Sequence, residues 1–297
     1  MLMRKIVHTI ANTESRVVGI NRRNIDLIYP NNPRKEFQIA DDKVFFKQTL
    51  SKQDVPVPTT YAIIEHLWEV DSKLKELESL ESLVIKPARG SGGQGIMILH
   101  KNKKGWLSLD GKHINQEQLR MHMASILYGA YSHDRADKVI VEEMLTPDPF
   151  HHRIYDSGIP DIRIIMYQDR PVMAMLRVPT SHSRGKANLH QGAIGIGIDM
   201  DRGELGEGVY KGRLIQVHPD SGVRFSGMKL PHWGELIRIS CQTASLVPLK
   251  FLGIDLILDS RHGPLVIEIN ARPGLQIQNA NRQGLMEILE NTKSSRP

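Results

Sequence analysis

The chain of 297 residues contains a single cysteine, Cys241, which excludes an internal disulfide and a zinc site built from several cysteines. Aromatic residues make up only 5% of the sequence, and no block of lysines and arginines carries interleaved aromatics, so a nucleic-acid-binding surface is disfavoured. No apolar run approaches the ~18 residues that would span a bilayer. The N-terminus lacks the long apolar core of a signal peptide. These absences predict a cytoplasmic globular protein.

The charge balance is basic, with a formal net charge of +6 and a pI of about 9.3. Nucleic acid is one partner that such a charge attracts. The basic residues are scattered along the sequence, however, so an anionic small substrate or a simple contribution to solubility explains the charge equally well.

The chain also lacks the GxxxxGK[ST] order of a P-loop. In its place, residues 84–98 (VIKPARGSGGQGIMI) read as a strand that ends in Lys86, a glycine-rich loop over 90–95, and a second strand. Glycines let backbone N–H groups approach phosphate oxygens closely, and a lysine adds a point charge. The stretch is therefore a candidate binding element for a nucleoside triphosphate, although an ordinary hairpin remains the alternative.

The hydrophobic pattern predicts mixed α and β structure in two lobes. Helices are expected over 41–50, 61–80, 116–128, 233–246 and 280–291. Strands are expected over 84–86, 95–100, 139–142, 162–167, 171–178, 193–199, 213–218, 254–258 and 265–269. Residues 1–40 show little sustained periodicity and read as an arm or a partial domain. A polar loop bounded by glycines is expected over 185–192.

Two of the predicted C-terminal strands carry carboxylates. Glu268 and Asn270 are two residues apart, so both side chains leave the same face of their strand. If this strand forms a hairpin with the preceding one, Asp255 approaches Glu268 across the ladder. Two carboxylates and an amide oxygen form the hard, oxygen-only site that Mg²⁺ prefers. An edge hairpin with its polar face in water is the alternative. Arg272 follows directly, where a planar cation suits a substrate carboxylate or a transferring phosphoryl group.

Taken together in this order, the motifs resemble the ATP-grasp superfamily and, within it, the RimK-type α-L-glutamate ligases. The series is the lysine-bearing strand, the glycine-rich loop, VEEML at 141–145, DIR at 161–163, NLHQG at 188–192, GID at 253–255 and EINARPG at 268–274. The resemblance implies an α+β (α/β) ATP-grasp fold with two lobes that clasp ATP, over 41–145 and 146–297, behind a shortened N-terminal segment.

The resemblance also implies roles for individual residues. Nucleotide binding falls to Lys43, Lys86, the flap formed by Gly90, Ser91, Gly92, Gly93, Gln94 and Gly95, the hinge formed by Glu142, Glu143, Met144 and Leu145, and Asp161 at the ribose. Metal binding falls to Asp255, Glu268 and Asn270. The groups around the acyl phosphate and the substrate carboxylates are Arg163, Arg177, Asn188 and Arg272.

The activity implied is ATP-dependent ligation of a carboxylate to an amine. An acyl phosphate would form, an amine would attack it, and ADP and phosphate would be released. ATP and two Mg²⁺ ions, with Mn²⁺ as a substitute, would be the cofactors, and glutamate or a related amino acid the donor. The acceptor would be a small molecule, a peptide or a protein tail, and an oligomer or partner chain would complete its site. A non-catalytic ATP-binding homologue is the alternative function, and a nucleic-acid binder is a poorer one.

Overall fold

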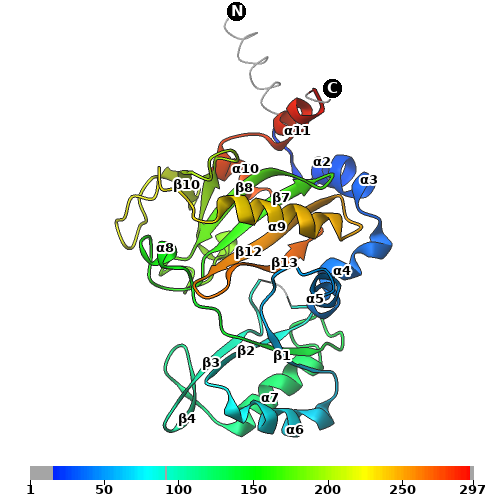
Figure 1. Ribbon diagram of the computed structural model, residues 1–297, viewed down its shortest axis with the longest axis vertical. Helices are drawn as coiled ribbons and strands as arrows, with labels where there is room; N and C mark the ends of the chain where they lie inside the picture. The colour runs from blue at the N-terminus through cyan, green and yellow to red at the C-terminus, as the bar shows by residue number, and fades with distance from the viewer. Residues whose placement is uncertain (1–15, 91, 295–297) are drawn as a thin grey trace, which may run out of the picture. The chain divides into compact units, whose positions relative to one another are not determined.

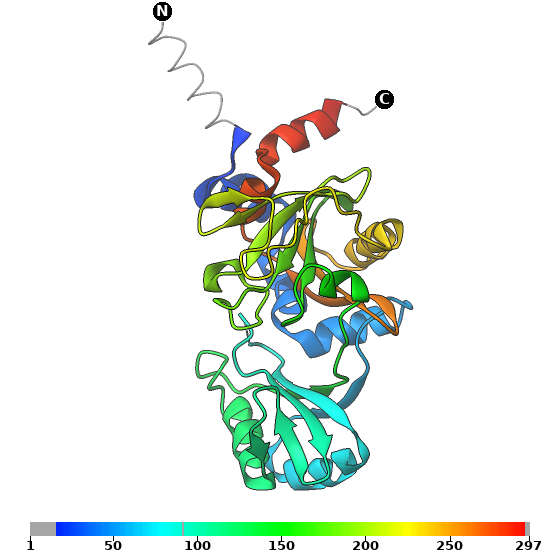
Figure 2. The same cartoon turned by 90° about the vertical axis from the view of Figure 1, so that its left-hand side faces the viewer.

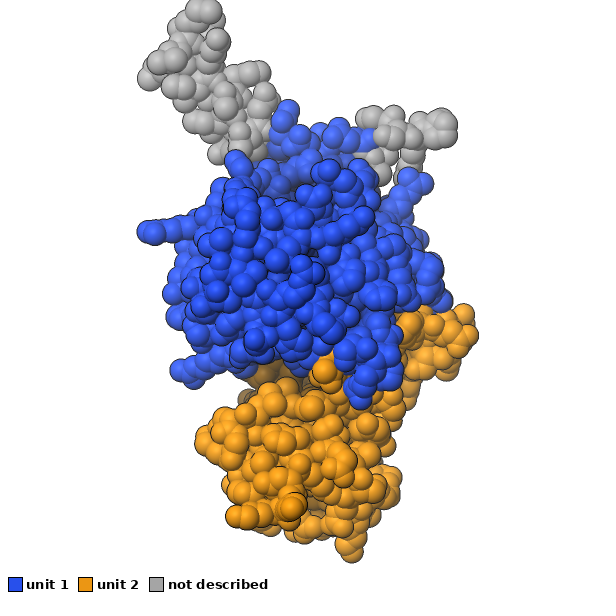
Figure 3. Space-filling model, turned by 60° about the vertical axis from the view of Figure 1, so that its left-hand side comes forward, with its two compact units in different colours: residues 1–40, 147–297 blue, residues 41–146 orange. Residues whose placement is uncertain are grey.

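The computed structural model describes residues 16–90 and 92–294, and it divides the chain into two compact units. Unit 1 comprises residues 1–40 and 147–297, and unit 2 comprises residues 41–146 (Figure 3). Within the described ranges, no helix combines the length and the apolar character that a membrane crossing requires.

Unit 2 is built on a six-stranded antiparallel sheet with the order β1-β6-β2-β3-β4-β5 (Figure 1). Its strands are β1 (Thr60–Ile64), β2 (Ser82–Pro87), β3 (Met97–Asn102), β4 (Gly105–Ser108), β5 (His113–Ile114) and β6 (Val139–Glu142). Its helices are α5 (Lys43–Ser51), η3 (Leu67–Glu69), α6 (Val70–Glu76), η4 (Leu77–Ser79) and α7 (Gln116–Leu127). The helices α6 and α7 lie side by side against the sheet and enclose the apolar core of the unit.

The single helix expected over 61–80 is wrong, because its first part is strand β1. Residues 55–58 (VPVP) force an extended path into the strand. The strand then pairs with β6, and this buries Ala62 and Ile64 on alternate positions. The helix α6 begins only at Val70. The short apolar run over 61–64 was expected to be helical, but it forms a strand because it pairs with β6.

Helix α5 begins at Lys43, within the helix expected over 41–50. The Asp42 side chain caps it by accepting hydrogen bonds from the backbone N–H groups of Val44 and Phe45. The buried face of the helix comprises Val44, Phe46, Lys47 and Leu50. One of these four residues is a lysine, and its buried position needs a chemical explanation, which the site below provides.

Unit 1 is built on a seven-stranded antiparallel sheet with the order β11-β10-β9-β8-β7-β12-β13. Its strands are β7 (Asp161–Tyr167), β8 (Arg170–Val178), β9 (Ile194–Ile198), β10 (Leu205–Tyr210), β11 (Arg213–Ile215), β12 (Phe251–Asp259) and β13 (Gly263–Asn270). The other elements from residue 147 onward are α8 (Pro149–His152), η5 (Leu189–Gln191), α9 (Trp233–Ser245), α10 (Gln276–Asn281) and α11 (Leu285–Ser294). Figure 2 shows α9 along one side of this sheet, where it contacts β7, β8, β12 and β13.

The C-terminal helix expected over 280–291 is divided into α10 and α11. Arg282 ends α10 in the left-handed backbone conformation, with φ of 53°. Gly284 then passes so close to the N-terminal segment that a Cβ atom there would lie 2.2 Å from the carbonyl oxygen of Arg16. The close approach of two backbones therefore interrupts the helical pattern.

The described part of the N-terminal segment, from residue 16, packs onto unit 1 as a series of short helices. They are α2 (Ile20–Arg22), η1 (Arg23–Ile28), α3 (Tyr29–Asn31), η2 (Arg34–Glu36) and α4 (Gln38–Asp41). Two buried amides attach the segment. Gln278 bonds to both the N–H and the carbonyl of Val18, at 2.9 and 3.0 Å. Asn32 donates to the carbonyls of Phe251 and Ala271. Residues that read as an arm or a partial domain thus lie against strand β12 and the loop after β13.

Candidate active site

The hairpin of β12 and β13 brings the predicted metal ligands together. Asp255 lies directly opposite Glu268, and Gly253 lies opposite Asn270, so the three polar side chains share one face of the sheet. The register expected from the sequence is therefore confirmed. On its other side β12 pairs with β7, which places Arg163 opposite Asp255.

Asp255 forms the centre of a network of charged side chains. Arg163 donates from Nε to Oδ1 at 2.7 Å and from Nη2 to Oδ2 at 2.6 Å. Arg177, on β8, donates from Nη2 to the same Oδ2 at 2.8 Å. Arg177 also pairs through Nε and Nη2 with both oxygens of Asp161. Two arginines and two aspartates thus form one cluster without net charge.

Burial and ion pairing act on these groups in opposite directions. Burial alone would raise the pKa of Asp255, but Arg163 and Arg177 outweigh it and hold the pKa well below its usual range. Burial dominates at Asp161 and raises its pKa to about 6, against the pull of Arg177. The two carboxyls therefore differ, because the pKa of Asp255 is lowered whereas the pKa of Asp161 is raised.

Glu268 and Asn270 extend this face toward the end of β13. The Asn270 amide nitrogen lies 3.2 Å from Asp255 Oδ2 and 3.5 Å from Glu268 Oε1. The three side chains therefore lie within reach of one another, and carboxylate and amide oxygens are the donor types that fit Mg²⁺. Among the described residues, no three His, Cys, Asp or Glu side chains gather as a metal site.

Gly253 lies directly beneath Pro273 and beside Arg163. A Cβ atom at Gly253 would lie 3.6 Å from Arg163 Nε and 3.0 Å from the Cβ of Pro273. The loop after β13 thus packs over the same point of β12. Arg272, within this loop, is exposed and lies over the Phe37 ring at 4.8 Å.

Asn188 lies in the loop that precedes β9, where its side chain accepts a hydrogen bond from the His190 N–H at 2.9 Å. The loop rests on the sheet through Leu189, since a Cβ atom at Gly195 would lie 2.8 Å from the Leu189 side chain. Gly195 pairs with Arg177 on β8. Asn188 is thus held in a turn near the strand that carries Arg177.

Unit 2 contains a second cluster, formed by two lysines and one glutamate. Glu142, at the end of β6, receives Lys47 Nζ on Oε1 and Lys86 Nζ on Oε2, each at 2.5 Å. All three side chains are buried. Lys86 was expected at the nucleotide, whereas Lys47 was missed. The signal for Lys47 is its place on the apolar stripe of α5, between Val44 and Leu50.

This trio carries more positive than negative charge in a buried setting. Burial alone would raise the pKa of Glu142, but Lys86 and Lys47 lower it below its usual value. Burial lowers the pKa of Lys47 to about 8, against the opposing effect of Glu142. Desolvating two ammonium groups around one carboxylate is costly, which is typical of a site prepared for an added anion.

The glycine-rich loop is fixed at its base. Lys43 Nζ donates to the carbonyl of Gly90 at 2.8 Å. The backbone N–H of Arg89 donates to both oxygens of the buried Asp137 carboxylate, with the nitrogen 3.2 Å from Oδ1 and 3.1 Å from Oδ2. The backbone adopts positive φ at Gly92, Gly93 and Gly95, a conformation that glycine reaches without the steric cost of a side chain. Gln94 lies among them, and Ser91 lies outside the described residues.

The predicted hinge residues leave unit 2 in an extended path. Glu143 is buried, and its Oε1 accepts a hydrogen bond from the Thr59 N–H at 2.7 Å. Leu145 is also buried, and Met144 lies between them. The side chain of Glu142 belongs to the lysine cluster, and this position of β6 pairs with Thr60 on β1 and with Val84 on β2.

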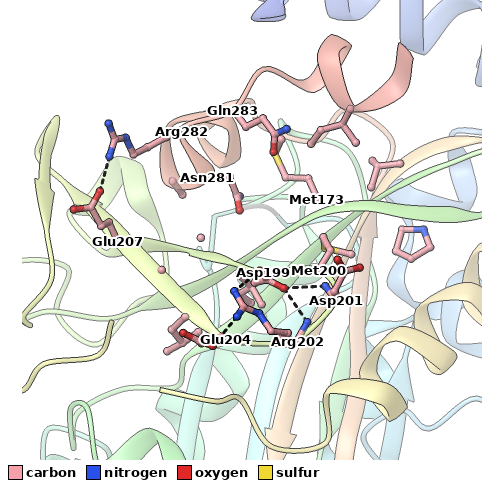
Figure 4. Close-up of a pocket in the computed structure, with 18 of the residues that line it drawn as sticks. Met173, Asp199, Met200, Asp201, Arg202, Glu204, Glu207, Asn281, Arg282 and Gln283 are labelled. Carbon is pink, nitrogen blue, oxygen red and sulfur yellow. Dashed lines mark hydrogen bonds and ion pairs between the residues drawn. The ribbon is translucent and has the colours of Figure 1, made fainter. Parts of the chain in front are cut away.

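A groove of about 930 Å³ lies elsewhere on unit 1, between β9, β10 and the end of α10 (Figure 4). Two ion pairs lie along it, Arg202 with Asp199 and Arg282 with Glu207. Met173, which lines the groove, is on the same strand as Arg177 but four residues away. Because these ion pairs satisfy one another, the groove is a weaker candidate than the Asp255 cluster.

Comparison with known families decides what this architecture is. The profile of the family described as "Sugar-transfer associated ATP-grasp" matches residues 22–294. The chain belongs to this ATP-grasp family. The fold class expected from the motifs is therefore confirmed, and the family adds a branch that the motifs did not indicate.

Individual relatives are distant. A "Probable alpha-L-glutamate ligase 2" of Hahella chejuensis is 24% identical over 250 residues, which cover 84% of this chain and 60% of that protein. A "Probable alpha-L-glutamate ligase" of Trichodesmium erythraeum is 23% identical over 249 residues, with 84% and 62% covered. The chain thus spans about three fifths of the length of these curated relatives.

A solved structure supports the same fold. D-alanyl-alanine synthetase A from Vibrio cholerae is similar with a TM-score of 0.51 at 12% sequence identity. The match covers 86% of this chain and 64% of that protein. At this level of identity the likeness concerns the ATP-grasp fold alone.

Proposed function

We propose that the protein is an ATP-dependent ligase that joins a carboxylate to an amine through an acyl phosphate and releases ADP and phosphate. The donor that we propose is glutamate or a related amino acid, because the relatives described above are named as probable α-L-glutamate ligases. The acceptor is proposed to be an amine or carboxylate group of a small molecule, a peptide or a protein tail.

The observation that carries this proposal is the polar face of the unit 1 sheet. There Asp255, Glu268 and Asn270 lie beside Arg163 and Arg177. Oxygen ligands and guanidinium groups within one cluster are the parts that phosphoryl transfer needs, since its transition state gathers negative charge on phosphoryl oxygens.

Glu268, Asn270 and Asp255 would hold Mg²⁺. When bound, the ion neutralises charge on phosphate oxygens and orients them. Asp255 would have to share its oxygens between the ion and the two arginines, because both oxygens already accept hydrogen bonds. Arg163 and Arg177 would then be available to the phosphoryl group or the substrate carboxylate.

Unit 2 would bind the phosphates. Lys47 and Lys86 share the carboxylate of Glu142, and the buried Glu143 also acts electrostatically on Lys47. A polyphosphate would bring further negative charge to these two lysines. The glycine-rich loop would add backbone N–H donors, which its positive φ angles make accessible.

The chemistry needs no protein nucleophile. A carboxylate oxygen of the donor attacks the γ-phosphorus of ATP, the bond to the bridging oxygen breaks, and ADP leaves. The amine nitrogen then attacks the acyl carbon, phosphate leaves with the oxygen it has gained, and the amine proton passes to solvent. The role of the protein is positioning and electrostatic stabilisation.

The test measures ADP release from ATP and Mg²⁺ with a panel of donor amino acids and acceptors, and identifies the products by mass spectrometry. Because the family description mentions sugar transfer, we include amino sugars in the acceptor panel. Lys86→Gln and Glu268→Gln should each abolish turnover. Lys112→Gln and Glu235→Gln, which change exposed side chains in the respective units, are the matched controls. Failure to bind ATP with Mg²⁺ at millimolar concentration would refute the proposal.

The alternative is a non-catalytic ATP-binding homologue that acts as a partner or regulator. It is favoured by the complete occupation of both Asp255 oxygens by arginines. ATP binding without turnover across the whole panel would select this alternative. A Lys86→Gln variant would then lose binding but have no activity to lose.

A further inference from the structure

Arg23 and Arg272 come together although they are 249 positions apart. Arg23 Nη1 donates to the carbonyl of Pro273 at 3.0 Å, which attaches it to the residue directly after Arg272. The guanidinium of Arg272 lies over the Phe37 ring, at 4.8 Å from its centre. Both Arg23 and Phe37 belong to the N-terminal segment, so this segment positions one arginine and supports the other.

The pair has no negative counterpart. Among the residues that the structure describes, neither arginine forms an ion pair with a carboxylate. Arg23 instead donates from Nε and Nη2 to the neutral amide oxygen of Asn24, at 3.2 and 3.0 Å. Burial, and then the positive charge of Arg272, lower the pKa of Arg23. Two guanidinium groups brought together without compensation are disfavoured on their own and become favourable once an anion joins them.

The position of the pair links it to the Asp255 cluster. Arg272 lies two residues beyond Asn270, and Pro273 packs against the Cβ position of Gly253, beside Arg163. We propose that Arg23 and Arg272 together form a subsite for an oxyanion group, a carboxylate or a phosphate, of the substrate. This inference deepens the proposed function, on which it rests, and assigns a binding role to the N-terminal segment.

Guanidinium groups bind carboxylates and phosphates through two parallel N–H donors, which makes the pair selective for a planar or tetrahedral oxyanion over a neutral group. Arg23 donates three hydrogen bonds to Asn24 and Pro273, and these bonds fix the orientation of its guanidinium. Because the side chain is already ordered, it loses less conformational entropy when an anion binds.

The sharpest test changes Asn24 rather than an arginine. Asn24→Asp keeps the shape and both hydrogen bonds to Arg23 but adds the missing negative charge. If Arg23 serves only to attach the N-terminal segment, this change leaves anion binding unaltered and strengthens the attachment. If the pair binds an anion, the new carboxylate competes with it. Arg23→Gln removes the charge directly, and Arg238→Gln on α9 is the control for net charge.

The experiment titrates the full chain with L-glutamate and with inorganic phosphate at low salt, using calorimetry. We expect at least one probe to bind, with the Kd raised on the order of tenfold or more in Asn24→Asp and Arg23→Gln. Arg238→Gln should match the wild type. The melting temperature of Asn24→Asp should be unchanged or higher. The probe that binds distinguishes a carboxylate from a phosphate subsite.

The inference is overturned if the wild type binds neither probe, or if Asn24→Asp binds both as the wild type does. The proposed function is judged separately, by ADP release. Probe binding that depends on Arg23 in a protein without turnover would refute the ligase and keep the subsite. Normal turnover with probe binding indifferent to Asn24→Asp would refute the subsite and keep the ligase.

Discussion

Arg163 and Asp255 meet side by side in a two-point contact, with Nε on Oδ1 and Nη2 on Oδ2 at 2.7 and 2.6 Å. They lie on neighbouring strands, β7 and β12, at positions that pair directly in the sheet. The backbone register therefore fixes the guanidinium against the carboxylate. Because the carboxylate is also the proposed metal ligand, bound Mg²⁺ would have to share the charge of Asp255 with Arg163 and Arg177.

Arg163→Lys tests what the two-point contact contributes. A lysine keeps the charge but offers a single point of contact, so it cannot orient Asp255 as the fork of arginine does. We expect kcat to fall by about 100-fold or more, on the scale of losing one preorganised electrostatic group. The fold should persist, because Arg177 still pairs with Asp255. Arg238→Lys, which changes an exposed arginine, is the control. A kcat for Arg163→Lys close to the wild-type value would contradict this role.

Glu142→Gln tests the buried lysine cluster in unit 2. The substitution keeps the size of the side chain but leaves Lys47 and Lys86 buried without a negative partner. Breaking a buried ion pair on one side costs roughly 3–5 kcal/mol. We expect a loss of this order in the free energy of unfolding measured by urea. Glu65→Gln, which removes an exposed partner of Lys138, should change it by no more than about 0.5 kcal/mol.

The same residue gives a pH signature. Since the Lys86 and Lys47 charges lower the folded-state pKa of Glu142, its ionised form stabilises the protein above its unfolded pKa of about 4.3. That stability is lost as the pH falls through the lower folded pKa. The wild type should therefore lose more stability between pH 5 and acid conditions than Glu142→Gln does. Parallel acid profiles of the two proteins would count against the cluster.

Lys47 predicts an alkaline limit to nucleotide binding. Burial lowers its pKa to about 8, so it is charged at pH 7 and loses its proton well before an ordinary lysine. The affinity for ATP with Mg²⁺ should decline as the pH rises from 7 to 9.5. In Lys47→Arg the charge persists, so the decline should flatten even if affinity at pH 7 is reduced. Equal pH slopes in the two proteins, measured by calorimetry, would exclude Lys47 from the phosphate contact.

Features that depend on local sequence could be predicted, whereas features that depend on contacts between distant residues could not. Asp255 could be placed opposite Glu268 because alternation and a turn-rich loop determine a hairpin register locally. Lys47 could not be found, because a lysine on a helix is usually solvated and only distant Glu142 makes its burial favourable. Residues 61–64 read as helix because their strand exists only through pairing with β6.

The N-terminal segment shows the same limit on a larger scale. Its described residues carry no periodicity that predicts where they pack, and their attachment depends on buried amides such as Asn32. The binding partners of Asn32 are backbone groups more than 200 positions away. Such contacts leave no pattern in the local sequence. The proposed role of Arg23 depends on this attachment.

Asn32→Asp tests the attachment directly. Asn32 is buried, and its amide nitrogen donates to the carbonyls of Phe251 and Ala271, while its oxygen accepts from the N–H groups of Lys250 and Phe251. A carboxylate accepts only, so it would face two carbonyl oxygens without a donor. We expect the free energy of unfolding to fall by about 3 kcal/mol or more. Asn279→Asp, on the exposed side of α10, should remain within about 0.5 kcal/mol of the wild type.

Because Ala271 adjoins Arg272, the surviving folded protein should also bind the anion probes more weakly. An Asn32→Asp protein of wild-type stability would show that the segment is held by other contacts.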